Sequence, residues 1–418
     1  MADFQETSNI SITCPKRITP FLKEELKEQH FPIKKARKAG VETEGTLQDC
    51  MKLVLTLRTA HRVHYLLDEF QAADSDEMYR QVQNIPWEDY IEPHGYVSVT
   101  SFIDNPTISN TQYANLTCKD AIVDRIRTET GTRPDSGPDL QHTVVFLYWR
   151  NSKCRVFLDT SGESLSRRGY RTESHTAPLQ ESLAAAIVKD TRWKTGAHFI
   201  NPMCGSGTLA IEATLMALNR PAGSLRPNFG IKHIKGFDQE YWDQLRGELK
   251  LASAKDTDSK IIATDRDPRA IKAARKNAKT AGVDHLIQFE VCDFNETPLP
   301  EGKGVVVLNP PYGERLGERE KLKGLYSDIG DFFKQKCTNY TGYVFTGNME
   351  LAKHIGLRTN RRTEFYNSTI DCRLLEFELH EEAGSDRTRM MLVERISAVY
   401  QYFLVKTCPF RVICVPYN

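Results

Sequence analysis

The chain has 418 residues, of which 40% are hydrophobic, and a formal net charge of +1. This length predicts two or three compact units, because single hydrophobic cores stop growing at about 250–300 residues. The near-zero charge excludes a strongly basic nucleic-acid-binding protein, so any such contact must come from local clusters. Two clusters are candidates, with a solvated surface as the equally weighted alternative for each: Lys34, Lys35, Arg37 and Lys38, and Arg167, Arg168 and Arg171.

The 10 cysteines are scattered along the chain, and no two of them form a Cys-x-x-Cys pair. This spacing argues against a zinc site and suits a reducing cytoplasm better than a secreted, disulfide-bonded scaffold. The N-terminus has no basic run followed by an apolar segment, and the most apolar late stretch, 398–415, is interrupted by Lys406 and Arg411. We therefore expect a cytoplasmic protein with no metal and no membrane span.

Residues 1–60 are predicted to form a small α/β unit. Residues 10–14 are apolar enough for a short strand, and Thr19 followed by Pro20 is typical of the start of a helix. A second helix is expected to begin at Thr46, because the apolar residues that follow it recur at helical spacing.

Residues 61–160 are predicted to form a second unit, of the α+β class. The pattern of apolar residues predicts, in order, strand 65–70, helix 76–82, strand 96–103 and helix 119–128. The apolar runs 143–148 and 154–158 flank a turn that contains Asn151 and Ser152, which is typical of a β-hairpin.

Residues 161–380 are predicted to form a doubly wound α/β domain with a parallel sheet. The polar, glycine-containing stretch 159–171 is expected to be the linker that leads into it. Helices and strands then alternate, as in repeated βαβ units. The expected elements are helix 179–189, strand 198–200, a helix from Thr208, strand 261–264, helix 270–281, and strands 287–291 and 304–308. The tail, 381–418, matches no pattern and receives no assignment.

The sharpest local feature of the third unit is the turn Gly205-Ser206-Gly207, which lies between a predicted strand and the helix from Thr208. Glycines at such a turn let a ligand approach the backbone, and the N-terminus of a helix offers free N–H groups. The competing interpretation is that the glycines serve only the tight packing of strand against helix. The residues that end the next strands favour a ligand site.

Carboxylates end the next two predicted strands. Asp265 can accept both ribose hydroxyls of an adenosine ligand, and Asp293 can accept the adenine amino group, with Phe294 beside the ring. Taken alone, Asp293 is more typical of a helix cap or a surface acid. The gap from Gly207 to Asp265 is much longer than the dinucleotide-fold spacing of about 20 residues, which indicates an insertion at 219–260 and disfavours NAD.

The fourth predicted strand runs directly into Asn309-Pro310-Pro311-Tyr312. An exocyclic amine on an aromatic base is a poor nucleophile, because its lone pair is delocalised into the ring. Two acceptors on its hydrogens, the side-chain oxygen of Asn309 and the backbone oxygen of Pro310, can turn that lone pair toward an incoming methyl group. The prolines stiffen the loop, and Tyr312 can supply a face for the unstacked base. The competing interpretation is a simple proline-rich turn.

Together these motifs resemble a known family. The sequences FINPMCGSGT (199–208), ATDRD (263–267), CDF (292–294) and NPPYGERLG (309–317), in that order, are similar to the class I RNA guanine-N2 methyltransferases of the RlmL type. The stretches 159–171 and 176–187 resemble the linker and the lead-in helix of the same family. The resemblance covers roughly residues 1–380, and the motifs are specific as a set.

The resemblance implies a Rossmann-like, S-adenosylmethionine-dependent methyltransferase domain, preceded by a ferredoxin-like unit at 1–60 and an RNA-gripping THUMP domain at 61–160. It implies S-adenosylmethionine as cofactor, RNA as partner, and N2-methylguanosine in 23S rRNA or a large-subunit precursor as product. The implied catalytic residues are Asn309, Pro310, Pro311 and Tyr312, and the implied cofactor-binding residues are Asn201, Cys204, Gly205, Ser206, Gly207, Thr208, Asp265, Asp293 and Phe294. Family members usually place Asp where Asn201 stands, so this chain keeps an acceptor there but loses a charge.

Three other functions remain open. Guanine-N2 methylation of tRNA is a close rival, since THUMP domains also accompany tRNA modification. Adenine-N6 methylation of DNA also uses an Asn-Pro-Pro-Tyr loop, but the THUMP-like half disfavours DNA. A non-catalytic RNA-binding or assembly factor is disfavoured by the intact Asp265, Asp293 and 309–312.

Overall fold

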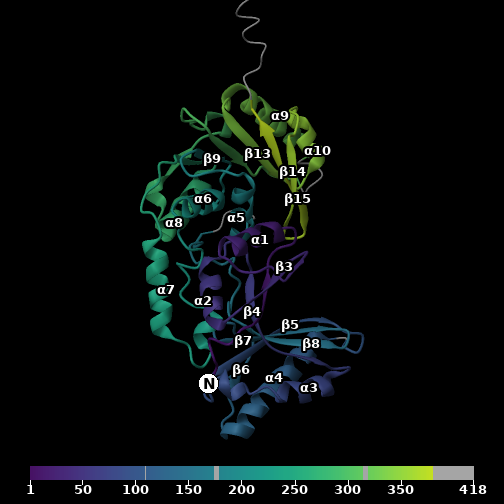
Figure 1. Cartoon of the computed structure of the whole chain (residues 1–418). Coiled ribbons are helices and arrows are strands. Elements are labelled where there is room, and N and C mark those ends of the chain that lie inside the picture. The colour runs from purple at the N-terminus through teal and green to yellow at the C-terminus, as the bar shows by residue number, and fades with distance from the viewer. Residues whose placement is uncertain (109, 174–177, 314–318, 380–418) are drawn as a thin grey trace, which may run out of the picture.

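The computed structural model describes residues 1–108, 110–173, 178–313 and 319–379 (Figure 1). Its helices are α1 (Thr19–Glu28), α2 (Leu47–Thr56), α3 (Ser75–Gln83), α4 (Thr111–Thr130), α5 (Glu181–Asp190), α6 (Thr208–Ala217), α7 (Gln239–Leu251), α8 (Pro268–Ala281), α9 (Arg319–Lys336) and α10 (Met349–Ala352). Its strands are β1 (Ser8–Thr13), β2 (Lys35–Arg37), β3 (Gly40–Gly45), β4 (Arg62–Gln71), β5 (Tyr96–Asp104), β6 (Asp135–Ser136), β7 (Thr143–Arg150), β8 (Lys153–Asp159), β9 (His198–Pro202), β10 (Ile261–Asp265), β11 (Ile287–Val291), β12 (Gly304–Leu308), β13 (Tyr340–Thr346), β14 (Arg361–Asn367) and β15 (Ile370–Glu378).

The first sheet unites the two N-terminal units that the sequence suggests. Its strand order is β2-β3-β1-β4-β8-β7-β5-β6, and β4 pairs antiparallel with β1 on one side and with β8 on the other. The two predicted units, 1–60 and 61–160, therefore share one continuous sheet, because β1 of the first is hydrogen-bonded to β4 of the second. Helices α3 and α4 cover one face of the β5–β7–β8 part, at the bottom of Figure 1, and enclose a separate hydrophobic core.

Local sequence signals account for several element boundaries in this half. Thr46 begins α2 as predicted: its hydroxyl accepts a hydrogen bond from the Asp49 N–H, and the Asp49 carboxylate accepts one from the Thr46 N–H. The hairpin β7–β8 turns at Asn151, whose φ of 51° suits a two-residue turn. Helix α4 is longer than predicted, because it begins at an Asn110 cap and ends at Gly131, with φ 74°.

The second sheet confirms the doubly wound α/β fold. Its order is β11-β10-β9-β12-β13-β15-β14, and β9 to β13 run parallel, while β15 and β14 add an antiparallel edge. The chain moves outward from β9 to β10 and β11, then returns past β9 to form β12. Ligands of such sheets bind beyond the carboxyl ends of the strands at the point where this order reverses, which here lies between β9 and β12.

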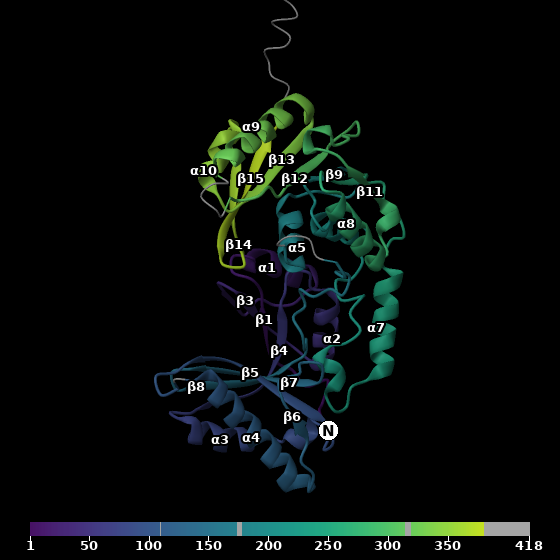
Figure 2. The same cartoon turned by 180° about the vertical axis from the view of Figure 1, so that it is seen from behind.

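The predicted linker and the predicted insertion tie the two halves together. Arg168 of the linker is 1% exposed and lies 3.5 Å from the Glu212 carboxylate of α6. In the insertion, the Gly223 N–H donates to the Leu55 carbonyl at 2.8 Å, and the Lys235 N–H donates to the Tyr90 carbonyl at 2.9 Å. Helix α7, also in the insertion, runs beside α2 along one side of the molecule in both views (Figure 1, Figure 2).

The described helices include none that is both long and apolar enough to cross a membrane. The eight cysteines in the described part of the chain are free thiols. Seven of these eight are buried, and Cys292 is the partly exposed one.

Replacing Arg168 with methionine is expected to lower the free energy of unfolding by about 3–5 kcal/mol, because it removes the guanidinium that pairs with the buried Glu212 carboxylate. Urea denaturation followed by circular dichroism measures this loss. Arg167→Met is the matched control and should stay within about 0.5 kcal/mol, since the Arg167 side chain is 73% exposed. A loss below about 1 kcal/mol for Arg168→Met, the range of a surface pair, would show that this buried pair contributes little to stability.

Candidate active site at the carboxyl edge of the second sheet

Strand register brings the predicted cofactor acid and the predicted catalytic amide to the same edge. Ile200 of β9 pairs with Ile262 of β10 on one side and with Val306 of β12 on the other. Asp265 lies three residues after Ile262, and Asn309 lies three residues after Val306. The two residues therefore lie at the same height along the strand direction, on either side of the turn that follows β9. Two strand spacings separate them, which is about 10 Å.

The two glycines of this turn have different roles. A Cβ atom on Gly207 would lie 2.9 Å from the Cβ of Ala274 in α8, so Gly207 serves the close packing of α6 against α8. A Cβ atom on Gly205 would meet nothing within 4 Å, which shows open space on its outer side. The backbone of both is left-handed, with φ 55° at Gly205 and 82° at Gly207. The turn therefore leaves room for a ligand at Gly205.

The other side chains of the turn point into the protein. Cys204, Ser206 and Thr208 are 9%, 5% and 5% exposed. The Cys204 N–H donates to the Thr264 carbonyl at 2.9 Å, and burial raises the pKa of the Cys204 thiol well above its usual range. The Thr208 hydroxyl accepts a hydrogen bond from the Arg171 guanidinium at 3.2 Å. A ligand at this turn would thus meet backbone groups rather than these side chains.

Asp265 joins the end of β10 to the turn after β9. One carboxylate oxygen accepts the Gly205 N–H at 3.0 Å, and the other accepts the Asp267 N–H at 2.9 Å. Each oxygen has a second lone pair, so the side chain, which is partly exposed, can accept further hydrogen bonds.

Asn201 links the ends of β9 and β12. It is fully buried, and its side-chain N–H donates to the Val307 carbonyl at 2.9 Å. An ionised Asp at this position has no N–H to make that bond. The amide oxygen of Asn201 has no hydrogen-bond partner among the described residues, and leaving a buried acceptor unpaired costs about 1–3 kcal/mol.

The residues after β11 correct one expectation. Asp293 caps the short helix Phe294–Glu296, accepting the Asn295 N–H at 3.3 Å, while the Glu296 carboxylate accepts the Asp293 N–H at 3.4 Å. The Phe294 ring does not lie beside an open ligand space: it is 5% exposed and packs edge to face on Phe332, 5.7 Å away. Val291, for which the sequence indicated no role, is 53% exposed and pairs in register with Asp265.

The loop after β12 is held by its own tyrosine. The Tyr312 hydroxyl donates to the Asn309 side-chain oxygen at 2.8 Å, and burial raises the pKa of that hydroxyl, so it stays a donor. The Tyr312 ring meets Phe345 edge to face at 6.3 Å and keeps part of its surface exposed.

Tyr326 of α9 and Asn348, which follows β13, hold the loop backbone, and no sequence motif indicated them. The Asn348 side-chain N–H donates to the Tyr312 carbonyl at 2.9 Å, and the Tyr326 hydroxyl donates to the Pro311 carbonyl at 3.2 Å. Asn348 is itself fixed, because its oxygen caps α10 and its N–H donates to the Thr346 hydroxyl at 3.1 Å. Residues 314–318, the rest of the predicted loop motif, lie outside the described residues.

Among the described residues, no three His, Cys, Asp or Glu side chains gather in a way that can hold a metal ion. The groups at this edge are backbone amides, carboxylates, an amide pair and a tyrosine, all of which act by hydrogen bonding.

Family models match three consecutive stretches of the chain. They are described as an RlmL ferredoxin-like domain at residues 9–64, a THUMP domain at 72–159, and an RMKL-like methyltransferase domain at 168–376, which is half of the chain. The chain belongs to the RMKL-like methyltransferase family.

A relative of this RMKL-like chain is the ribosomal RNA large subunit methyltransferase K/L of Syntrophotalea carbinolica, which is 37% identical over 394 residues. The alignment covers 91% of this chain and 55% of the relative, so the chain spans about half the length of the curated relatives it matches. A putative methyltransferase crystallised with SAH superimposes with a TM-score of 0.82 at 26% identity, covering 90% of this chain and 99% of that one. A predicted N6-adenine-specific DNA methylase of Listeria monocytogenes gives 0.80 at 27% identity, covering 90% and 97%.

Substituting alanine for Gly207 of this RMKL-like chain should destabilise it. The left-handed backbone costs about 1–2 kcal/mol for a residue with a Cβ atom, and the contact with Ala274 adds about 1–3 kcal/mol. Gly247→Ala is the control, because this glycine lies within α7 with nothing within 4 Å of the added atom, and it should gain about 0.5–1 kcal/mol. Equal thermal midpoints for the two variants would contradict this account of the turn.

Proposed function

We propose that the chain is an S-adenosylmethionine-dependent RNA methyltransferase that forms N2-methylguanosine in the 23S rRNA of the large ribosomal subunit. The observation that carries the proposal is the strand register, which sets the Asn309 loop beside the turn and carboxylate at Gly205 and Asp265. The THUMP and RMKL-like matches and the name of the K/L relatives support RNA, and ribosomal RNA in particular, as substrate. Such a substrate would place the reaction in the cytoplasm.

Five residues at this edge fit S-adenosylmethionine. Gly205 leaves open space at the turn, and Asp265 has lone pairs for ribose hydroxyls. Asn201 has a buried oxygen without a described partner, which suits a donor on the methionine part. At β11, Asp293 would accept the adenine amino group, and the exposed Val291 would take the flanking role first given to Phe294. The cofactor would supply a methyl group made electrophilic by its bond to a sulfonium.

The Asn309 loop would turn a guanine amine into a nucleophile. The Tyr312 hydroxyl takes one lone pair of the Asn309 oxygen and leaves the second for an amine hydrogen. Among the described residues, no group donates to the Pro310 carbonyl, so it can accept the other hydrogen. Because Asn348 and Tyr326 fix this loop, the acceptors are placed before substrate binds, and positioning of this kind can supply up to about 7–11 kcal/mol. The proton can leave to water after methyl transfer.

The most informative test is nucleoside mass spectrometry of rRNA, tRNA and genomic DNA from cells that lack the gene, with the lost modification mapped. The proposal expects loss of an N2-methylguanosine from 23S rRNA, restored by the wild-type gene and not by the gene for Asn309→Ala. Loss from tRNA alone would replace the substrate with tRNA, and loss of N6-methyladenine from DNA would favour the DNA alternative. Unchanged nucleosides in every pool would favour a non-catalytic factor.

Asn309→Ala should lower the turnover number by about 10²–10³, because it removes one fixed hydrogen-bonding group at the transition state. Radiolabelled methyl transfer to total rRNA from the deletion strain measures the effect. Calorimetry with S-adenosylhomocysteine is the control and should show affinity within about twofold, because the cofactor groups are untouched. Near-normal turnover would remove Asn309 from the mechanism.

Asp265→Ala should weaken cofactor binding by about 10–100-fold, since hydrogen bonds to a charged group contribute about 1.5–3 kcal/mol. The measurement is calorimetry with S-adenosylhomocysteine. Asp256→Ala is the matched control, because Asp256 is an exposed acid in the loop before β10. Equal affinities for the two variants would exclude Asp265 as the ribose acceptor.

A further inference from the structure

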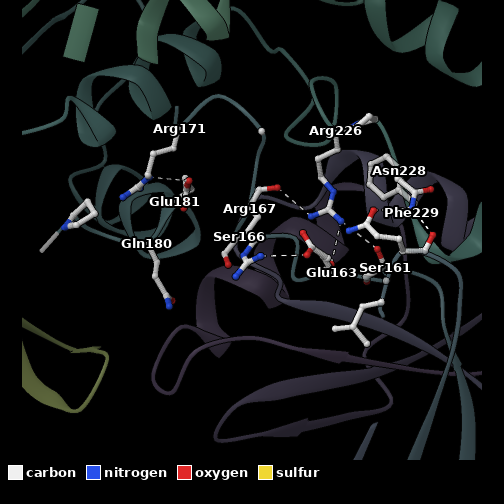
Figure 3. Close-up of a pocket in the computed structure, with 16 residues that line it drawn as sticks. Ser161, Glu163, Ser166, Arg167, Arg171, Gln180, Glu181, Arg226, Asn228 and Phe229 are labelled. Atoms are coloured by element: carbon white, nitrogen blue, oxygen red, sulfur yellow. Dashed lines mark hydrogen bonds and ion pairs between the residues drawn. The ribbon is translucent and has the colours of Figure 1, made fainter. Parts of the chain in front are cut away.

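A cavity of about 600 Å³ opens beside the linker, and none of the residues proposed for methyl transfer lines it (Figure 3). We name it the linker pocket. Four segments form its walls: residues 161–171 of the linker, 178–181 at the start of α5, 226–229 of the insertion, and 140–141 before β7. Its volume lies within the range of about 300–1,000 Å³ that is usual for small-molecule and cofactor sites.

One wall of the linker pocket carries a fixed positive charge. Arg226 is 8% exposed, and its guanidinium donates to four linker carbonyls, including those of Ser164 at 2.5 Å and Glu163 at 3.1 Å. Burial lowers the pKa of Arg226 only to about 10, so it remains charged at neutral pH. No carboxylate pairs with it among the described residues, and its Nε has no partner there. The carboxylates of Glu163 and Asp159 stabilise this charge from a distance, and the direct hydrogen bonds of the guanidinium go to backbone carbonyls.

The linker adds two further arginines to the pocket, and both already have acidic partners. Arg171 lies 3.2 Å from the Glu181 carboxylate, and Arg167 lies 3.2 Å from the Glu163 carboxylate. The Arg167 side chain is 73% exposed, and solvent weakens a surface pair of this kind, so Arg167 can exchange its acidic partner for a ligand. The charged residues that line the pocket are thus three arginines and two glutamates, which leaves an excess of one positive charge.

The pocket chemistry selects an anion that also carries hydrogen-bonding groups. A guanidinium binds phosphate oxygens in a bidentate manner. Gln180 adds an exposed amide that can both donate and accept, as the edge of a nucleic-acid base requires. A nucleotide combines both features and is small enough for the cavity.

The position of the linker pocket ties it to the proposed substrate. Gln141, which lines the pocket, belongs to the THUMP domain. Arg171, which also lines it, donates a hydrogen bond to the Thr208 hydroxyl, and Thr208 is the first residue of α6, directly after the glycine turn. An RNA strand that passes from the THUMP domain to the Asn309 loop would cross this region. We propose that the linker pocket binds one nucleotide of the substrate RNA strand, with its phosphate on Arg167, an inference that rests on the proposed RNA substrate.

The test compares Arg167→Glu with Arg246→Glu, a matched charge reversal at an exposed arginine of α7. Fluorescence anisotropy with a fluorescein-labelled, 12-nucleotide single-stranded RNA gives the affinity at several salt concentrations. Arg167→Glu should weaken binding about tenfold and lower the slope of log Kd against log salt by about 0.7, the value for one lost phosphate contact on a single strand. Arg246→Glu should stay within about twofold of wild type, and Arg167→Lys should recover most of the affinity because it restores the charge.

Two results would overturn the inference. One is an unchanged RNA affinity and salt slope in Arg167→Glu. The other is micromolar binding of free GMP, measured by calorimetry, that Arg167→Glu abolishes while RNA binding stays intact, because the pocket would then hold a free nucleotide. S-adenosylhomocysteine affinity and methyl transfer by the wild-type chain are measured separately. A chain that transfers no methyl group but whose RNA binding depends on Arg167 would therefore contradict the methyltransferase proposal while supporting the nucleotide site in the linker pocket.

Discussion

The parallel register around β9 is the constraint on which the rest of the site depends. Because β10 and β12 flank β9 and all three run the same way, the residues that follow them meet at one edge of the sheet. The bond from the Asn201 side chain to the Val307 carbonyl fixes the spacing of β9 and β12 where they separate. The bond from the Gly205 N–H to Asp265 does the same between β9 and β10. Neither the turn nor the Asn309 loop can shift far without breaking one of these contacts.

Buried arginines extend this rigidity from the edge to the half that contains the THUMP domain. Arg168 reaches both α6, through Glu212, and the carbonyl of Arg58, which follows α2. The Arg226 guanidinium donates hydrogen bonds to linker carbonyls, so the segment that joins the two halves is packed into the protein rather than a free connection. RNA held by the THUMP domain would therefore lie at a fixed distance from the Asn309 loop. This geometry would select the target nucleotide by its position as well as by its chemistry.

Local signals in the sequence predicted much of the fold and of the site, whereas contacts between residues far apart in the sequence could not be predicted from it. Thr46, the Asn151 turn and the βαβ alternation are short-range patterns, and the structure has the α2 start, the hairpin and the parallel sheet they predict. The pairing of β1 with β4 joins residues about fifty positions apart, so the continuous first sheet was missed. Phe294 illustrates a subtler limit, since a motif gives the order of residues but not which side chain turns inward. Asn348 was missed because its role arises only where β13 ends beside the Asn309 loop.

The central claim is that one edge of the second sheet seats the methyl donor and the acceptor groups for the target amine together. The structure of the chain bound to S-adenosylhomocysteine tests it most directly. The account predicts ribose hydroxyls on Asp265 and a sulfur that faces the Asn309 oxygen and the Pro310 carbonyl. A ligand bound elsewhere, or one whose sulfur is turned away from the Asn309 loop, would contradict it.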